Sequence, residues 1–209
     1  MKFIDLTHTI ENGLVTYRGL PAPKITTWMS YEDSRAKYDG RAEFRINTIE
    51  ILANTGTYLD APSHRVAGGA DLADLPLASV AALPGIVIDH GDDVTNYDVQ
   101  GRAVIIRTGW SRHWNTEQYF DGNPFVTRAE AEWLAKSGAK LVGIDSLNID
   151  DTKDPSRPAH TILLQNGVVV LEHLTNLNLL PKDGFELFAV PPKLKGMDTF
   201  TVRAFALVR

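Results

Sequence analysis

The sequence contains no cysteine. Disulfide bonds, thiolate metal ligands and a cysteine nucleophile are therefore excluded. No apolar run approaches the roughly 18 residues that a membrane-spanning helix needs. The opening segment acquires an acidic side chain at Asp5 and has no long apolar core, so it does not resemble a secretory signal. We expect a cytoplasmic protein with no membrane partner.

Positive charge is also scarce. The chain has 21 Lys and Arg against 26 Asp and Glu, a formal net charge of -5, and its basic residues form no run. Nucleic-acid binding is therefore not expected. The length of 209 residues, 44% of them hydrophobic, fits one domain with a substantial core. We expect a single domain over residues 1–209.

Several catalytic motifs are missing too. The sequence has no metalloprotease helix motif, phosphate-binding loop, dinucleotide fingerprint or Gly-x-Ser-x-Gly elbow. What it does have is short apolar runs rich in β-branched residues, which predict strands. The predicted strands are Phe3–Ile10, Phe44–Leu52, Ile86–Asp89, Val104–Thr108, Leu141–Ile144, Val168–Leu171, Leu187–Val190 and Thr201–Val208.

Helices are fewer than strands. Thr127 and Glu130 have capping-box spacing and predict a helix that ends at Gly138. A shorter helix is predicted over Leu77–Leu83, closed by Pro84 and Gly85. The excess of predicted strands over helices favours an α/β domain with a mixed, barrel-like sheet over a doubly wound one. The polar segment Tyr31–Arg45 fits a mobile flap or an ordinary surface loop.

The segment Asn54–His64 holds the densest set of chemically useful side chains. Gly56 and Pro62 argue against a helix here. In extended chain alternate side chains share a face, so Asn54, Tyr58 and Asp60 fall on one side. Pro62 would then turn the chain and return His64 to the same pocket. From the residues alone, Asp60 and His64 fit half of a metal site, a general-base pair or a surface hydrogen-bonded pair.

This segment resembles the signature of the cyclase, or kynurenine formamidase-like, family of metal-dependent hydrolases. That signature reads His-x-Gly-Thr-His-x-Asp-x-Pro-x-His, and it appears here as Asn54-Thr-Gly-Thr-Tyr58-Leu-Asp60-Ala-Pro-Ser-His64. Further matches follow in the family's order over nearly the whole chain. They include Ile4–Ile10, Gly13–Tyr17, Asp74–Leu77, Ile106–Trp110, Val142–Ser146, His160–Leu164, Leu171–Leu177, Leu180–Pro181, Gly196–Asp198 and Val202–Ala204.

The resemblance implies a swivelling β/β/α fold, a homodimer or homotetramer, and hydrolysis of a small molecule. It places metal ligands at Asp60, His160 and Glu172, and a proton-transferring histidine at His64. It also places a substrate-contacting aromatic side chain at Tyr17.

Two positions depart from the signature, because Asn54 and Tyr58 stand where the family has metal-binding histidines. Amide and hydroxyl oxygens are poorer zinc ligands than imidazole. The resemblance therefore implies one divalent metal, with zinc expected first and manganese second, and a second site that is empty or weak. Asn54 and Tyr58 are free to donate hydrogen bonds to an oxyanion.

The other histidines and the tryptophans are assigned more modest roles. His173 stands where the family usually has Asn, and in a strand it would point away from Glu172. We expect a structural role for it, and for His8 a buried, hydrogen-bonded one. His90 and His113 are expected to be solvated. Trp110 and Trp114 fit core packing or the wall of a substrate pocket.

The expected reaction is attack of a metal-activated water on an amide, lactam, lactone or ester carbon, with His64 moving protons. Two alternatives stay open. In the first, the chain is a catalytically inactive or regulatory protein that binds small molecules. In the second, it is a metal-independent cyclase or isomerase in which Asp60 and His64 act as a base pair and Tyr58 as an acid.

Overall fold

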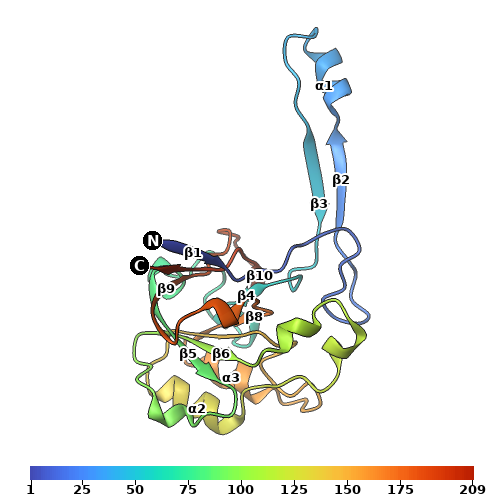
Figure 1. The fold of residues 1–209 in the computed structure, drawn as a ribbon. Coiled ribbons are helices and arrows are strands. Elements are labelled where there is room, and N and C mark those ends of the chain that lie inside the picture. The colour runs from blue at the N-terminus through green and yellow to red at the C-terminus, as the bar shows by residue number, and fades with distance from the viewer.

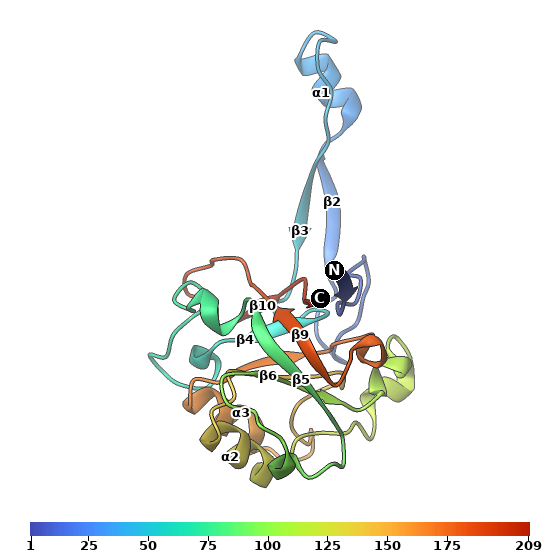
Figure 2. The ribbon, with the colours of Figure 1, turned by 60° about the vertical axis from the view of Figure 1, so that its left-hand side comes forward.

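A computed structural model describes residues 1–209. Its body is a nine-stranded mixed sheet with the strand order β1-β11-β9-β5-β6-β7-β8-β4-β10, which curls around its own axis (Figure 1, Figure 2). The strands are β1 (Lys2–Asp5), β4 (Tyr58–Asp60), β5 (Leu83–Asp89), β6 (Ala103–Arg107), β7 (Leu141–Ile144), β8 (Val169–Glu172), β9 (Asp183–Phe188), β10 (Thr199–Thr201) and β11 (Phe205–Val208). The predicted α/β fold with a mixed, barrel-like sheet and few helices is confirmed.

The centre of the sheet is parallel. Strands β5, β6, β7 and β8 run side by side in one direction, and the remaining pairs are antiparallel. Both faces of these central strands are buried, which explains their almost continuous apolar sequences. Alternate side chains enter two separate cores: Ile105 lies in one and its neighbour Val104 in the other.

Two helices cover one face of this sheet, α2 (Arg128–Lys136) and α3 (Pro158–Gln165). The predicted capping box at Thr127 and Glu130 is present. Helix α3 was not predicted from the sequence. Six short 3-10 helices complete the body: Pro62–His64, Leu77–Ser79, Val94–Asn96, Trp110–His113, Glu117–Phe120 and Leu177–Leu179. None of the helices has the length and apolar character needed to cross a bilayer.

A long arm projects from the body (Figure 1, Figure 2). It consists of β2 (Lys24–Met29), α1 (Tyr31–Lys37) and β3 (Ile46–Glu50), and β2 and β3 form a separate two-stranded sheet. The arm contains most of the segment predicted as a flap or surface loop, which instead begins with a helix capped by Ser30. Every residue of β3 is exposed. The arm therefore has almost no core of its own.

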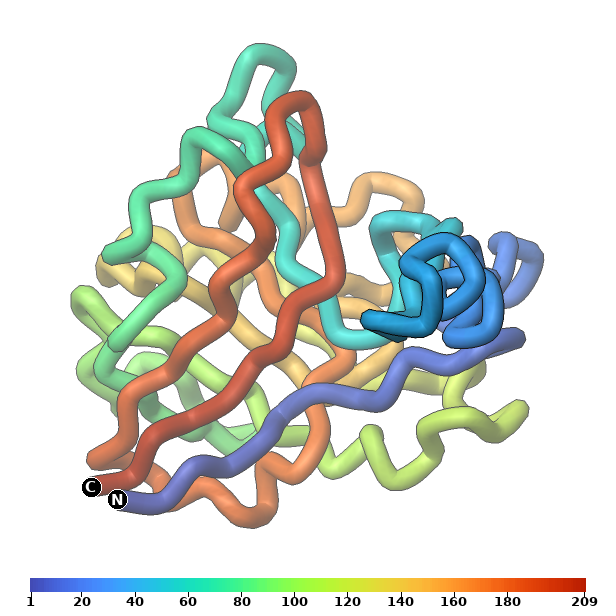
Figure 3. The backbone as a smooth tube through the Cα atoms, turned by 90° about the horizontal axis from the view of Figure 1, so that it is seen from above, coloured from blue at the N-terminus to red at the C-terminus, as the bar shows by residue number.

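Three strand predictions were wrong in extent. The strand expected over Leu187–Val190 instead covers Asp183–Phe188. The strand expected over Phe3–Ile10 ends at Asp5, after which Thr7 forms a single bridge to Leu174. The strand expected over Thr201–Val208 is divided between β10 and β11. Strand β11 pairs with β1, so the two chain ends lie side by side (Figure 3).

The helix expected over Leu77–Leu83 was also wrong. Only Leu77–Ser79 is helical, and Pro84 and Gly85 do not close a helix but lie within β5. The reason for Gly85 is packing, since a Cβ there would lie 2.0 Å from the ring of Phe185. Glycine at this position admits the aromatic ring and does not mark a turn.

Candidate active site

The structure brings Asp60, His64 and His160 together. One ligand atom from each lies within 4.8 Å of the other two. His160 Nε2 is 3.4 Å from Asp60 Oδ2, and His64 Nδ1 is 4.0 Å from Asp60 Oδ1. A carboxylate and two imidazoles at these separations are a donor set that zinc or manganese accepts.

Local structure places each of the three side chains. Asp60 ends β4, and its neighbour Tyr58 shares the same face of that short strand. Pro62 then opens a 3-10 turn that ends with His64, which returns the imidazole toward the carboxylate. His160 lies in the first turn of α3, which packs against that 3-10 turn.

Asp60 lacks the hydrogen bonds that a buried carboxylate normally accepts, and its charged neighbours are the imidazoles of His160 and His64. Its side chain is 0% exposed, and neither carboxylate oxygen accepts a hydrogen bond. A buried carboxylate that accepts no hydrogen bond is strongly unfavourable unless nearby positive charge compensates it. The surroundings of Asp60 therefore fit a bound cation.

His160 is oriented by a second carboxylate, Asp150. Its Nδ1 lies 2.6 Å from Asp150 Oδ2, which leaves Nε2 directed at Asp60. This carboxylate–histidine pair is the usual support of a metal-binding imidazole. Burial by itself lowers the pKa of His160, but the nearby carboxylates of Glu172, Asp150 and Asp60 outweigh it and hold that pKa well above its usual value. Binding of a cation at Nε2 would release this proton.

Glu172 lies on the other side of His160. Its Oε1 is 3.6 Å from His160 Nε2, and its side chain is 0% exposed. Both oxygens already accept hydrogen bonds, Oε1 from the backbone N–H of Ile149 and Oε2 from the hydroxyl of Tyr58. Tyr58 faces Glu172 because the two residues are direct partners in the antiparallel pairing of β4 with β8.

A network of aromatic side chains continues inward from Tyr58. The Tyr58 hydroxyl is 2.8 Å from that of Tyr17, which in turn lies 3.3 Å from His173 Nε2. His173 Nδ1 is 2.8 Å from the hydroxyl of Tyr119. Burial raises the pKa of Tyr58 well above its usual value, so this side chain stays protonated and can donate to Glu172. Tyr58, which replaces a histidine of the family signature, is thus part of a hydrogen-bonded network that includes Glu172 and Tyr17.

A pocket of about 220 Å³ opens beside the cluster. Three side chains predicted to contact substrate line it, namely Tyr17, Asn54 and Tyr58, together with His64 and His160. Asn54 comes from the loop before β4, where Gly56 has a left-handed φ of 65° and its N–H donates to Thr16. The remaining lining residues are Leu20, Arg65, Asn148 and Arg157.

Two histidine predictions need correction. His173 does not lie in a strand, because β8 ends at Glu172 and His173 has a left-handed φ of 54°. Its ring packs beside Tyr58 and Tyr17, and burial lowers its pKa to about 3. His8 is only half-buried, and its Nε2 has no hydrogen-bond partner, so the expected hydrogen-bonded role is wrong.

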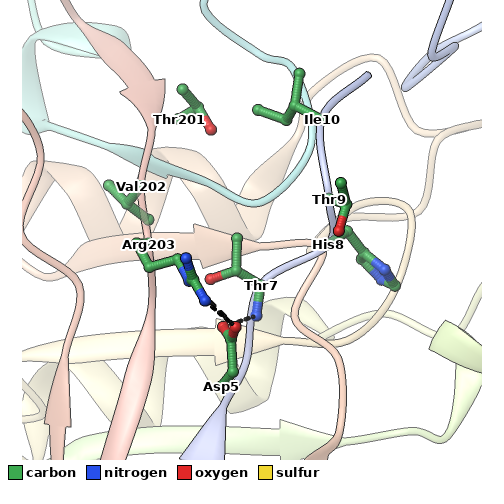
Figure 4. A pocket seen from close by; sticks show the side chains of 8 residues that line it. All are labelled: Asp5, Thr7, His8, Thr9, Ile10, Thr201, Val202 and Arg203. Carbon is green, nitrogen blue, oxygen red and sulfur yellow. Dashed lines mark hydrogen bonds and ion pairs between the residues drawn. The ribbon is translucent and has the colours of Figure 1, made fainter. Parts of the chain in front are cut away.

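His8 belongs to a separate pocket, lined also by Asp5 and Arg203 (Figure 4). The imidazole of His8 lies apart from the ion pair of Asp5 and Arg203, and it stacks on Trp114 with ring centroids 4.0 Å apart. Neither Trp110 nor Trp114 lines the pocket beside Asp60. His90 is exposed as expected, whereas His113 is half-buried and accepts a hydrogen bond from Arg112.

Sequence reasoning missed four side chains at this site: Asp150, Asn148, Arg65 and Arg157. Asp150 and Asn148 follow β7, and polar residues after a parallel strand are a recognisable signal. The two arginines have no comparable signal, because they reach the pocket only through the turn after β4 and the start of α3.

This α/β domain, with two imidazoles lining a small pocket and a buried carboxylate beside them, is a hydrolase. More specifically, the chain belongs to the Cyclase family, described as "Putative cyclase", which matches residues 4–151.

Several relatives resemble it over their full length. Kynurenine formamidase from Bacillus cytotoxicus is 29% identical over 97% of this chain and 96% of that protein. The Bacillus mycoides kynurenine formamidase is 27% identical over the same shares. A solved structure of a potential metal-dependent hydrolase with cyclase activity has a TM-score of 0.80 and 29% identity, covering 100% of this chain and 98% of the other. Isatin hydrolase A from Ralstonia solanacearum has a TM-score of 0.81 at 24% identity, covering 100% and 92%, which shows a shared fold.

Proposed function

We propose that this chain hydrolyses a C–N or C–O bond of a small amide, lactam, lactone or ester with the help of one divalent cation. The observation that carries the proposal is Asp60, whose two buried oxygens accept no hydrogen bond and lie beside two imidazoles. Relatives described as a kynurenine formamidase and as a potential metal-dependent hydrolase support this reaction class.

Asp60, His160 and Glu172 are the proposed cation ligands. Ligands about 2.1 Å from a tetrahedral ion lie about 3.4 Å apart. The separations of 3.4 Å from His160 to Asp60 and 3.6 Å from His160 to Glu172 match that spacing, whereas Glu172 is outside the group whose ligand atoms all lie within 4.8 Å of one another. When bound, zinc or manganese polarises a carbonyl group and makes water more acidic. The hydrogen bonds from Tyr58 and Ile149 leave lone pairs on Glu172 for ligation.

His64 is the proposed proton carrier. Its side chain is 28% exposed, so it can exchange protons with solvent, and it lines the pocket. It takes a proton from the attacking water and returns one to the leaving group. Asn54 also lines the pocket, and its amide makes no hydrogen bond within the chain, so it is the proposed oxyanion donor. Tyr17 and Tyr58 form the wall against which the substrate rests.

His64 is also the competing candidate for the third ligand. It belongs to the cluster in which every pair of ligand atoms lies within 4.8 Å, and Glu172 does not. The variants His64→Gln and Glu172→Gln separate the two assignments. Elemental analysis of each purified protein, after dialysis against zinc, measures the metal content.

We expect His64→Gln to keep about one metal per chain and to lose turnover by about 10²- to 10⁴-fold, the usual contribution of a general acid or base. Glu172→Gln should lose most of the metal. The opposite pattern would make His64 the ligand. Wild-type turnover that survives chelation would overturn the metal-dependent mechanism in favour of acid–base chemistry by Asp60 and His64, and a wild-type protein that holds no metal would support a non-catalytic binding role.

We further propose that the chain is a homodimer or homotetramer held through its arm. Trp28, Tyr31 and Ile49 on the arm are 73%, 52% and 55% exposed, and the body does not cover them. Apolar side chains gathered on one projection are typical of an interface. A second copy of this chain, whose arm presents the same surface, is the proposed partner.

A further inference from the structure

The pocket beside Asp60 has an unusual charge for this chain. The molecule carries a net charge of -5, yet no Asp or Glu lines the pocket. Its charged lining residues are Arg65 and Arg157, which accompany His64 and His160. The charged side chains that line the entrance are therefore arginines, whereas the carboxylates of Asp60, Asp150 and Glu172 lie buried behind His160. Lining charges of one sign favour the entry of a ligand of the opposite sign.

Arg157 is held in place by its surroundings. It precedes α3 with φ 45° and ψ 61°, a left-handed conformation that is rare for a bulky side chain and costs free energy. Its Nη1 donates to Asn148 Oδ1 at 3.2 Å, and Asn148 also donates to Tyr17. Arg157 pairs with no carboxylate. Its guanidinium lines the pocket and makes no other hydrogen bond within the chain, so its remaining donors are free.

Arg65 approaches from the turn that carries His64. It directly follows the 3-10 turn Pro62–His64, which packs against α3. Its side chain is exposed and, like that of Arg157, has no carboxylate partner. Most other arginines of the chain do have one, including Arg18, Arg35 and Arg203. Two unpaired guanidinium groups thus border one small pocket.

We propose that the substrate carries a carboxylate, and that Arg157, assisted by Arg65, binds it beside the bond to be cleaved. This inference rests on the proposed function, because it adds a recognition group to that same reaction. The planar guanidinium matches the two oxygens of a carboxylate in a bidentate contact. Arg157, already fixed by Asn148, loses little freedom on binding and is the principal determinant.

The test is calorimetric titration of the protein, supplied with zinc, with three probes of similar shape: benzoate, phenyl phosphate and benzamide. The variants are Arg157→Gln, Arg157→Lys and Arg65→Gln. Arg128→Gln is the control, because Arg128 is exposed at the start of α2 and does not line the pocket. Thermal unfolding of each variant shows whether it folds.

We expect the wild type to bind benzoate more tightly than benzamide. Arg157→Gln should weaken benzoate binding by about 10- to 100-fold, as expected for hydrogen bonds to a charged group, and leave benzamide binding unchanged. Arg157→Lys should recover part of the loss. Arg65→Gln should weaken benzoate binding by about 3-fold, because exposed charges are screened, and Arg128→Gln should have no effect.

Benzoate affinity that is independent of Arg157 and is lost in Asp60→Asn would place the carboxylate on the cation and overturn the inference. Tighter binding of phenyl phosphate than of benzoate would overturn the assignment to a carboxylate. These titrations require no turnover, and metal content is measured on the same samples. A protein without metal that still binds benzoate through Arg157 would contradict the proposed hydrolysis and leave the inference intact.

Discussion

The cluster at Asp60 and the arm depart from the usual distribution of side chains in opposite ways. At the cluster, a carboxylate is completely buried and accepts no hydrogen bond. On the arm, Trp28 is 73% exposed although it is the largest apolar side chain of its strand. Buried polar groups and exposed apolar patches are the informative exceptions in folded proteins.

Each exception indicates a missing partner of matching chemistry. The buried carboxylate requires positive charge, which a cation supplies, whereas the exposed aromatic surface requires another apolar surface, which a second copy supplies. The rest of the body follows the ordinary rule. Asp145, for example, is 1% exposed, and it accepts hydrogen bonds from Thr108, Gly109 and Ser111. Asp145 thus serves the fold, whereas Asp60 serves a ligand.

The largest expected effect comes from replacing either of the two buried aspartates, Asp60 or Asp145, with asparagine. Asp60→Asn should remove the metal and reduce turnover by roughly 10³-fold or more, because the cation loses a charged ligand. In the metal-free protein the loss of stability should be small, since Asp60 accepts no hydrogen bond and only its 3.4 Å contact with His160 is weakened. Asp145→Asn should keep the metal and lose about 1–3 kcal/mol of unfolding free energy, because donors are left facing an amide. Elemental analysis measures the metal content of each variant, and urea unfolding measures its free energy of unfolding. An equal loss of stability in the two variants would contradict the distinction between a metal-binding Asp60 and a structural Asp145.

The next largest effect concerns the arm. The double variant Trp28→Ser and Ile49→Ser should raise the dissociation constant of the oligomer by about 10³-fold, since each truncated interface anchor costs about 2 kcal/mol. Sedimentation velocity at several concentrations measures the association. Leu77→Ser is the control, because Leu77 is 68% exposed but lies on the body. A double variant that associates like the wild type would show that the arm serves another purpose.

His8 tests whether an unpartnered polar atom always indicates a ligand. Burial lowers its pKa to about 4 from 6.5, so between these pH values the unfolded chain binds more protons than the folded one. Stability should therefore fall as the pH drops from 6.5 towards 4, with about 2 kcal/mol lost to His8 at pH 5. His8→Phe should remove this part of the pH dependence and leave metal content unchanged. Urea unfolding of the wild type and of His8→Phe at pH 7.5 and pH 5 measures this difference in stability. Loss of metal in His8→Phe would show that His8 belongs to the metal site.

The smallest effect is local. Ser34 is the one completely buried residue of α1, and its hydroxyl donates to Tyr31 O and accepts from the N–H of Phe44. Ser34→Ala should cost about 1 kcal/mol. Because the arm is separate from the body, hydrogen exchange should accelerate at the tip of the arm while the main unfolding transition stays in place. A shift of the main transition would mean that the arm and the body unfold together.

The parts of the fold that could be predicted are those encoded by neighbouring residues. The capping box at Thr127 and Glu130 and the apolar runs of β6 and β7 are of this kind. Helix α3 was missed because its N-cap is Arg157, which provides no side-chain cap, and Pro158 is its only start signal. The start of α1 could have been found, since Ser30 and Asp33 form a capping box within the polar segment.

The site residues likewise fall into those that neighbouring sequence predicts and those that only long-range contacts bring together. Asp60 and His64 could be predicted to lie close together because only three residues, which include the turn-forming Pro62, separate them. His160 and Glu172 came only from the resemblance, since the α3 packing and the β4–β8 register that bring them close are long-range features. Isolation of the arm could not be predicted either, because alternating β-branched residues describe an exposed ribbon and a buried strand equally well.

The central claim is that a cation binds between Asp60 and His160. Anomalous diffraction from crystals grown with manganese or zinc tests it most directly, because it locates the ion without any assumption about substrate. We predict one strong peak per chain within bonding distance of Asp60 and of His160 Nε2. A crystal with intact Asp60 that shows no peak there, or a peak only elsewhere on the molecule, would contradict the account.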